Sequence, residues 1–145
     1  MKRTAALILA LSLLVPTLSL AEMMSITGRW VNFREGPSTK TAVVFKADKY
    51  YPVKVLKKTG NWAQVEDFQG DQAWISLSLL SKEKGVVIKA NKANIRTQPS
   101  TKAPVSFTAS KGCAFKVLEQ QGDWVHVEHA DGDKGWVHKS LVWGL

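Results

Sequence analysis

The chain contains one segment twice, and this duplication constrains its fold more than any other feature. Residues 32–79 align with residues 94–141 at a constant offset of 62, with no inserted or deleted position, and 22 of the 48 aligned pairs are identical. A repeat of this length predicts two copies of one small domain. We therefore expect the structural features of the first copy to have counterparts in the second.

Short alternating segments in each copy predict β-strands. Val53 and Val55 flank Lys54, which is the period of two that is typical of half-buried strands. Glycine-containing turns at residues 59–61 and 69–71 separate these segments, and the second copy has turns at the matching positions. No stretch after residue 21 carries a sustained helical period of apolar residues with caps. The mature chain is therefore predicted to be all-β.

Four tryptophans of these strands are predicted to face away from the valine core. In each copy, alternation along the strand places the valines on one face and Trp62 or Trp124 on the other. Trp74 and Trp136 are separated from their aliphatic neighbours in the same way. Two interpretations remain open: the rings form a binding surface, or they are partly buried walls packed under loops.

Arg34 and Arg96 are matching positions beside the first turn of each copy. Each follows a core-facing residue, Phe33 or Ile95, so each is expected to point outward. One interpretation is an arginine at the rim of a groove, which grips a carboxylate or stacks on tryptophan. The other is an arginine that satisfies carbonyl groups of its own loop.

The N-terminal segment has the pattern of a secretory signal. A basic pair precedes an apolar run from Ala5 to Leu14, and the small residues Ser19 and Ala21 fit cleavage before Glu22. A retained, uncleaved anchor is the alternative. We expect an exported protein, periplasmic or extracellular, with no stable membrane insertion once the signal is removed.

The charge balance bears on the partners of such a protein. Cleavage removes two basic residues and no acidic one, so the net charge falls from +8 to +6. Nucleic acid is a poor partner for an exported protein, and we expect none. An acidic wall polymer or an anionic membrane surface would attract the chain nonspecifically.

The thiol and imidazole groups do not form a recognisable reactive site. Cys113 is the only cysteine and alternates with Phe115 in an apolar pattern, so a structural role is expected, with an intermolecular bridge or reactive thiol as the alternative. His126 and His129 are three residues apart on a strand and face opposite sides, and His138 is further along the chain. We therefore expect no metal site and no cofactor.

The ordered motifs of the repeat resemble the bacterial SH3-like domain family. Asn-x-Arg-x-Gly-Pro-Ser comes first, followed by Pro-Val-Lys-Val-Leu, Gly-x-Trp-x-x-Val and Gly-x-x-x-Trp-Ile/Val, over Gly28–Ser81 and Val87–Val142. The resemblance implies small, strongly bent barrels of five or six strands. It also implies ligand-binding modules, often attached to enzymes or proteins that work on the bacterial cell wall. The sequence departs from the family pattern at Ala73, at Gln98, and at Lys92, which stands where the first copy has Trp30.

These observations predict two tandem SH3-like β-barrels after a signal peptide. The expected parts are a signal peptide (1–21), an N-terminal extension (22–27), domain 1 (28–81), a charged linker (82–86) and domain 2 (87–145). In the cell-wall peptidases that are often fused to such modules, the resemblance implies that catalysis requires a separate domain with a cysteine and histidines. No such domain fits beside two repeats, so no enzymatic activity and no catalytic residue are expected.

The function expected from the sequence is noncatalytic binding of cell-envelope material, either peptidoglycan peptides or a peptide segment of an envelope protein. Two shallow aromatic grooves with a basic rim would do the binding. The alternative is an adaptor that scaffolds a periplasmic or surface protein complex. The residues expected to line the grooves are Arg34, Trp62, Trp74, Arg96, Trp124 and Trp136.

Overall fold

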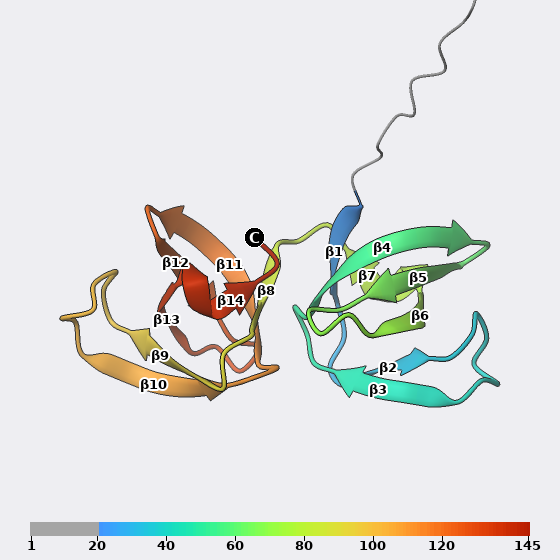
Figure 1. Cartoon of the computed structure of the whole chain (residues 1–145), viewed down its shortest axis with the longest axis horizontal. Helices are drawn as coiled ribbons and strands as arrows, with labels where there is room; N and C mark the ends of the chain where they lie inside the picture. The colour runs from blue at the N-terminus through green and yellow to red at the C-terminus, as the bar shows by residue number, and fades with distance from the viewer. Residues whose placement is uncertain (1–20) are drawn as a thin grey trace, which may run out of the picture.

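The computed structural model describes residues 21–145 and contains two β-domains that follow one another along the chain (Figure 1). The predicted signal peptide therefore lies, apart from Ala21, outside the described residues. Within the described part, no helix has the length and apolar character needed to cross a membrane. The prediction of an all-β tandem is confirmed.

Domain 1 is one antiparallel sheet of seven strands that bends around its own core. The order of strands in the sheet is β3-β2-β6-β5-β4-β1-β7. A single 3-10 turn, η1 (Leu77–Leu79), connects the last two strands of domain 1. The strands are β1 (Glu22–Ile26), β2 (Val31–Arg34), β3 (Val43–Ala47), β4 (Pro52–Thr59), β5 (Trp62–Glu66), β6 (Gln72–Ser76) and β7 (Leu80–Ser81).

Domain 2 repeats this sheet strand for strand. Its order is β10-β9-β13-β12-β11-β8-β14, and η2 (Lys139–Leu141) occupies the place of η1. The constant offset in the sequence thus corresponds to a constant topology. The strands are β8 (Gly85–Ile88), β9 (Lys92–Arg96), β10 (Val105–Ser110), β11 (Ala114–Gln121), β12 (Trp124–Glu128), β13 (Lys134–His138) and β14 (Val142–Trp143).

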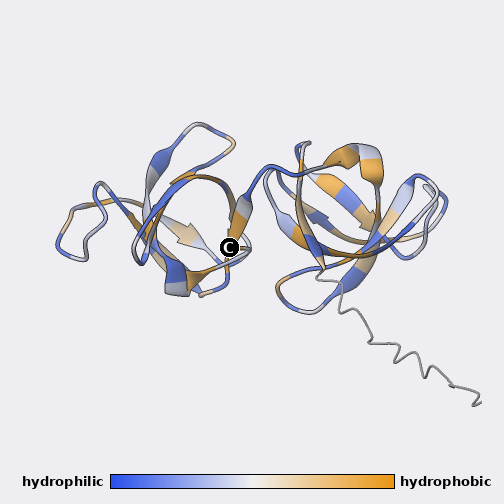
Figure 2. Ribbon diagram, turned by 90° about the horizontal axis from the view of Figure 1, so that it is seen from above, coloured by the Kyte–Doolittle hydropathy of each residue, from blue (hydrophilic) through white to orange (hydrophobic). Residues whose placement is uncertain are grey.

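Alternating apolar residues form the core of each domain, as Figure 2 shows for the strands around each interior. Val53, Val65 and Ile75 are fully buried in domain 1. In domain 2, Val127 aligns with Val65 and Val137 with Ile75, and both are also fully buried. Burying such side chains contributes about 1.5 to 3 kcal/mol each. The period of two therefore sets which face of every strand is inside.

Seven strands exceed the five or six that the family resemblance implies, because segments at the predicted boundaries pair into the sheets. Residues 22–27 were expected as an extension, but Glu22–Ile26 is β1, which pairs with β4 and β7 and buries Ile26. Residues 82–86 were expected as a linker, but β8 begins at Gly85 and pairs with β11 and β14. Only residues 82–84 are exposed there.

The two domains pack against each other directly. Val87 and Ala114 of domain 2 belong to the buried cluster of domain 1. The Ser25 hydroxyl donates a hydrogen bond of 2.6 Å to the Glu83 carbonyl oxygen. A Cβ atom added to Gly85 would overlap the carbonyl oxygen of Tyr50. The junction is thus built from close apolar and main-chain contacts as well as from the connecting segment.

A buried hydrogen bond fixes one turn of domain 1 to its core. Tyr51 and Asp67 are both nearly inaccessible, and the tyrosine hydroxyl donates to Asp67 Oδ2 over 3.0 Å. The other carboxylate oxygen accepts from the backbone N–H groups of Gln69 and Asp71. Burial, and then the Asp67 charge, raises the pKa of Tyr51 above its ordinary value.

Replacing Tyr51 by phenylalanine is expected to lower the free energy of unfolding by about 1 to 3 kcal/mol, because Asp67 Oδ2 would then be buried without that donor. Because the pKa of Tyr51 is raised by folding, the stability of the wild type should also depend on pH in the alkaline range. The wild type keeps the full contribution of Tyr51 below the unfolded-state pKa of about 10 and loses it as pH rises further. The variant should lack this alkaline loss, which urea denaturation at several pH values measures.

Tyr50→Phe is the matched control, since the Tyr50 hydroxyl makes no side-chain hydrogen bond within residues 21–145. Equal stability of the two variants, with the same alkaline profile, would contradict the assigned role of the Tyr51 hydroxyl.

Candidate functional site

Aromatic strip 1 consists of Arg34, Trp62 and Trp74, on the outward face of domain 1. Trp74 on β6 stands opposite Arg34 on β2 and opposite Gln64 on β5. Trp62 lies two residues before Gln64 on β5, so it projects from the same face. Both indoles are partly exposed. The structure therefore brings the three predicted residues of domain 1 onto one surface.

Aromatic strip 2 consists of Arg96, Trp124 and Trp136, in the same arrangement on domain 2. Trp136 on β13 stands opposite Arg96 on β9 and opposite His126 on β12. Trp124 lies two residues before His126 on the same strand. The sequence repeat therefore produces two surfaces of equal design.

The two strips differ in how far their rings are covered. His126 stacks on Trp136 with ring centroids 4.6 Å apart and planes 9° from parallel, and Trp136 is only 8% exposed. His138 meets the edge of Trp124 at 5.3 Å. In domain 1 the stacking histidine is replaced by Gln64, so Trp74 is more open. Strip 1 consequently offers the more accessible aromatic surface.

The charge beside each strip also differs. The ammonium of Lys57 lies 5.6 Å from the centroid of the Trp74 ring. The matching residue in domain 2 is Glu119, which stands opposite His126 in the sheet. A cation placed over an indole face is attracted by its quadrupole. Strip 1 therefore has a basic flank, and strip 2 has an acidic residue in that place.

The two arginines brace their own loops. Arg34 Nη1 donates to the carbonyl oxygens of Thr39 and Thr41, each at 2.8 Å. Arg96 Nη1 donates to the carbonyl oxygen of Ala103 at 2.9 Å. Of the two interpretations open at the sequence level, the geometry supports the one in which arginine satisfies loop carbonyls. This bracing fixes each guanidinium against its own loop, on a strand position that pairs with Trp74 or Trp136.

The strips lie on the outer sheet faces, away from three cavities of the described residues 21–145. One of them, of about 670 Å³, lies between the two domains. The other two, about 400 and 290 Å³, adjoin the residues at 143–145. None of the six predicted site residues lines any of these cavities. A binding surface formed by the strips would thus be shallow.

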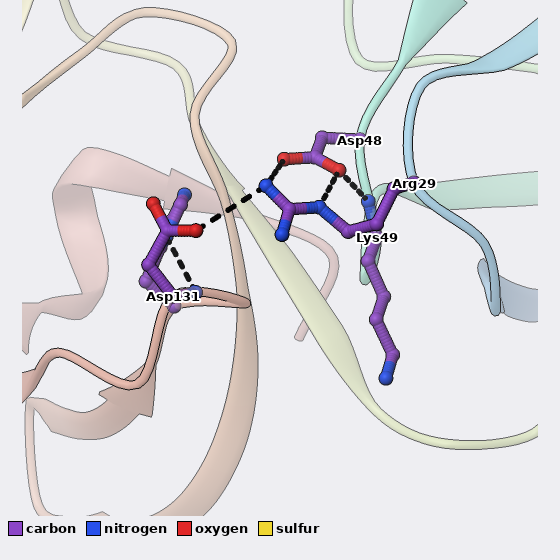
Figure 3. Close-up of polar contacts among 5 residues, drawn as sticks. Arg29, Asp48, Lys49 and Asp131 are labelled. Atoms are coloured by element: carbon purple, nitrogen blue, oxygen red, sulfur yellow. Dashed lines mark hydrogen bonds and ion pairs between the residues drawn. The ribbon is translucent and has the colours of Figure 1, made fainter.

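An ion-pair cluster joins the two domains (Figure 3), and its members Arg29, Asp48 and Asp131 line the interdomain cavity. Arg29 donates to both carboxylate oxygens of Asp48, at 2.6 and 3.1 Å, and to Asp131 of domain 2 at 3.3 Å. Burial alone would raise the pKa of Asp48, but hydrogen bonds from Arg29 and from the Lys49 and Trp30 backbone outweigh it and lower that pKa. The pKa of Arg29 is raised, chiefly by its hydrogen bond to Asp48.

Trp30 is a residue that sequence reasoning did not place in a site. It is 64% exposed, lines the interdomain cavity, and has a backbone φ of 51°, in the left-handed region that side chains rarely adopt. The sequence held one indication of a special role for Trp30, because the second copy has Lys92 at the aligned position. That difference between the copies did not indicate that the two domains meet beside Trp30.

Cys113 and the histidines occupy structural places. Cys113 is a free, half-buried thiol beside the core of domain 2, and burial, followed by Asp48 and Asp131, raises its pKa. A raised thiol pKa opposes thiolate chemistry. His129 Nδ1 accepts from the Asp131 backbone N–H. Among residues 21–145 there is no cluster of three or more groups suited to a metal ion.

Comparison with known proteins identifies the repeated unit. The family model for the bacterial SH3 domain matches residues 28–82 and again residues 89–144. A probable cell wall amidase LytH from Staphylococcus epidermidis is 34% identical over 62 residues, which are 42% of this chain and 21% of that protein. A putative N-acetylmuramoyl-L-alanine amidase YrvJ from Bacillus subtilis is 29% identical over 65 residues, 45% of this chain and 12% of that protein.

The chain thus spans about a fifth or less of these relatives. Among solved structures, NlpC2 from Trichomonas vaginalis matches 86% of this chain and 48% of its own at 15% identity, with a TM-score of 0.36. An NlpC/P60 family protein from Bacillus cereus matches 83% of this chain and 55% of its own at 14% identity, with a TM-score of 0.35. At such scores these likenesses support no argument about arrangement or activity.

Proposed function

The chain belongs to the bacterial SH3 domain family, with two domains in tandem, and we propose that it is a noncatalytic binding protein for cell-envelope material. The ligand is a peptidoglycan peptide or a peptide segment of an envelope protein. The protein acts after export, in the periplasm or outside the cell, and needs no cofactor. Its role is to hold this material rather than to cleave it.

One observation carries this proposal: each domain presents tryptophans and a braced arginine together on the same outward face. Indole rings supply a large rigid contact area, and the fixed guanidinium supplies polar contacts at their edge. The likeness to a probable cell wall amidase and to a putative N-acetylmuramoyl-L-alanine amidase adds support for the class of ligand. The shared region covers 21% of the first relative and 12% of the second.

Strip 1 is the principal binding surface in this proposal. Trp62 and Trp74 are not stacked under a histidine, and Lys57 adds a positive charge beside them. A peptide backbone laid along the strip gains apolar contact from the rings and a polar contact from the basic flank. Strip 2 binds the same ligand more weakly, because His126 covers Trp136.

Sedimentation with purified sacculi tests the proposal. The wild type is expected to sediment with the sacculi, and Trp74→Ala and Trp62→Ala are each expected to raise the apparent Kd about five- to tenfold, as for other aromatic anchors. Trp124→Ala should have a smaller effect, because strip 2 is the weaker site. Circular dichroism confirms that each variant remains folded.

Leu56→Ala is the matched control for lost apolar area, since Leu56 is an exposed residue of domain 1 outside the strip. It should bind as the wild type does. Absence of wild-type binding to sacculi would exclude a peptidoglycan peptide as the ligand, and equal retention of all folded tryptophan variants would contradict the role of the strips. Recovery of one abundant protein in place of envelope peptides, after cross-linking, would support an adaptor instead.

A further inference from the structure

The interdomain cavity is formed where equivalent turns of the two domains face each other. On one side are the end of β3 with the β3–β4 turn (residues 45–48) and the β5–β6 turn (residues 67–69) of domain 1. On the other side are the β10–β11 and β12–β13 turns of domain 2, including residues 110–114 and Asp131. A cavity of about 670 Å³ is large enough for a peptide side chain and its neighbours. It exists only in the tandem.

The two copies differ at the positions that meet in this cavity. Asp48 aligns with Ser110, Tyr51 with Cys113, Asp67 with His129, and Gln69 with Asp131, and all eight residues line the cavity. The strips, by contrast, keep the same tryptophans and arginines. The cavity is therefore an asymmetric site, with chemistry that neither copy has alone.

Carboxylates are concentrated around this cavity. Four of the six aspartates in the chain line it, although the chain as a whole carries a net charge of +8. Arg29 is already paired with Asp48 and Asp131, and Asp67 is held by Tyr51 and its own turn. Asp71 is exposed and makes no salt bridge within residues 21–145. The basic residues of the lining are Arg29, Lys46 and Lys111. The four aspartates therefore exceed the lysines and arginine by one negative charge.

Aromatic residues line the same cavity as these carboxylates. Trp30 exposes its indole at the cavity, and Phe45, Tyr51 and Phe68 contribute to the lining. A non-glycine residue at a φ of 51° costs about 1 kcal/mol or more, and such strain clusters at functional sites. An aromatic face next to a carboxylate fits an ammonium group on an aliphatic stem, through cation–π attraction and a charge-assisted hydrogen bond.

We propose that the interdomain cavity binds the protonated amine of a lysine-type side chain in a peptide. The aliphatic stem lies along Trp30, and the ammonium faces Asp71, since Asp131 is already paired with Arg29 and His129. This inference rests on the proposed function, since it names the feature of an envelope peptide that the tandem recognises. The strips hold the peptide, and the cavity selects for a free side-chain amine.

A matched pair of probe peptides tests this directly. Nα-acetyl-Lys-D-Ala-D-Ala is titrated into the 15N-labelled protein and followed by NMR, alongside the same peptide acetylated at Nε. The free amine is expected to shift the signals of Trp30 and Asp71, with binding that weakens as salt rises. The acetylated peptide, which lacks the charge, should bind at least about fivefold more weakly.

The chain offers a precise control for the carboxylate. Asp71→Asn should weaken binding of the free amine about three- to fivefold, whereas Asp133→Asn should not, because Asp133 is the aligned, exposed aspartate of domain 2 and lies outside the cavity. Trp30→Ala should weaken it similarly. Lack of binding, equal binding of both peptides, or equal effects of the two aspartate variants would overturn the inference.

The two proposals fail in different ways. If the cavity inference is wrong and the proposed function is right, sacculi retain the protein and Trp74→Ala releases it, while Asp71→Asn leaves amine selectivity unchanged. If the proposed function is wrong, the strip variants leave retention on sacculi unchanged, whatever the probe peptides do.

Discussion

Replacing Gly85 by alanine is expected to lower the free energy of unfolding by about 3 kcal/mol, the largest effect that we predict for a single methyl group. A Cβ atom at this position would overlap the main-chain carbonyl oxygen of Tyr50 and approach the Cβ atom of Ser25 to 3.2 Å. Neither group can rotate away, because Ser25 is in β1 and the Tyr50 backbone N–H donates to Ile26. Urea denaturation measures the loss.

Gly60→Ala is the control for this prediction. Gly60 has a φ of +58° and no atom within 4 Å of an added Cβ, so alanine there carries only the left-handed backbone cost of about 1 kcal/mol. If Gly85→Ala were no more destabilising than Gly60→Ala, the close approach of the two domains at this point would be wrong.

Gly135→Ala is expected to lower the free energy of unfolding by about 2 kcal/mol, and Ile95→Leu should remove much of that cost. An added Cβ at residue 135 would lie 2.5 Å from Cγ2 of Ile95 and 3.0 Å from the Arg96 carbonyl oxygen. Leucine has nearly the same volume but no methyl branch at Cβ. In domain 1 the aligned positions hold Ala73 and Phe33, and phenylalanine has no methyl branch at Cβ.

A double-mutant cycle by urea denaturation tests this pair. Ile95→Val is the matched control, since valine keeps Cγ2 and should leave the cost of Gly135→Ala unchanged. We expect a coupling of about 1 kcal/mol or more with leucine and close to none with valine. Equal costs of Gly135→Ala in all three backgrounds would show that the Ile95 branch is not the obstacle.

The fold could be predicted from the sequence because its determinants are local and occur twice. The alternation around Val53 and Val65 predicts strand faces, and the turns at conserved offsets predict equal topology in both copies. The strands at the domain boundaries were not predicted, since Glu22–Ile26 and Gly85–Ile88 lie outside the aligned repeat. Their pairing with β4 and β11 is set by sheet edges that only the folded domain presents.

The candidate strips followed from the same alternation, whereas the cover on Trp136 did not. Alternation places His126 and Trp136 on one face, but it does not show that the rings stack. Arg34 was left between two interpretations because its role depends on where the carbonyl groups of Thr39 and Thr41 point. The roles of all six strip residues in binding stay predictions.

The interdomain cavity was beyond sequence reasoning for a physical reason. Its lining comes from turns that are far apart in the chain, such as those at Asp48 and Asp131, and turn residues carry no periodicity that indicates a partner. Only the packing of Gly85 against Tyr50, and of Val87 within the core of domain 1, brings those turns together.

The indole N–H signals of the six tryptophans offer the most direct test of envelope recognition by the strips. Soluble muropeptides released from sacculi are added to 15N-labelled protein, and each indole is assigned by substitution. The Trp62 and Trp74 signals should move most and those of Trp124 and Trp136 less, while Trp143, which packs against the domain 1 core, should stay in place. Unchanged Trp62 and Trp74 signals at saturating muropeptide would contradict the account.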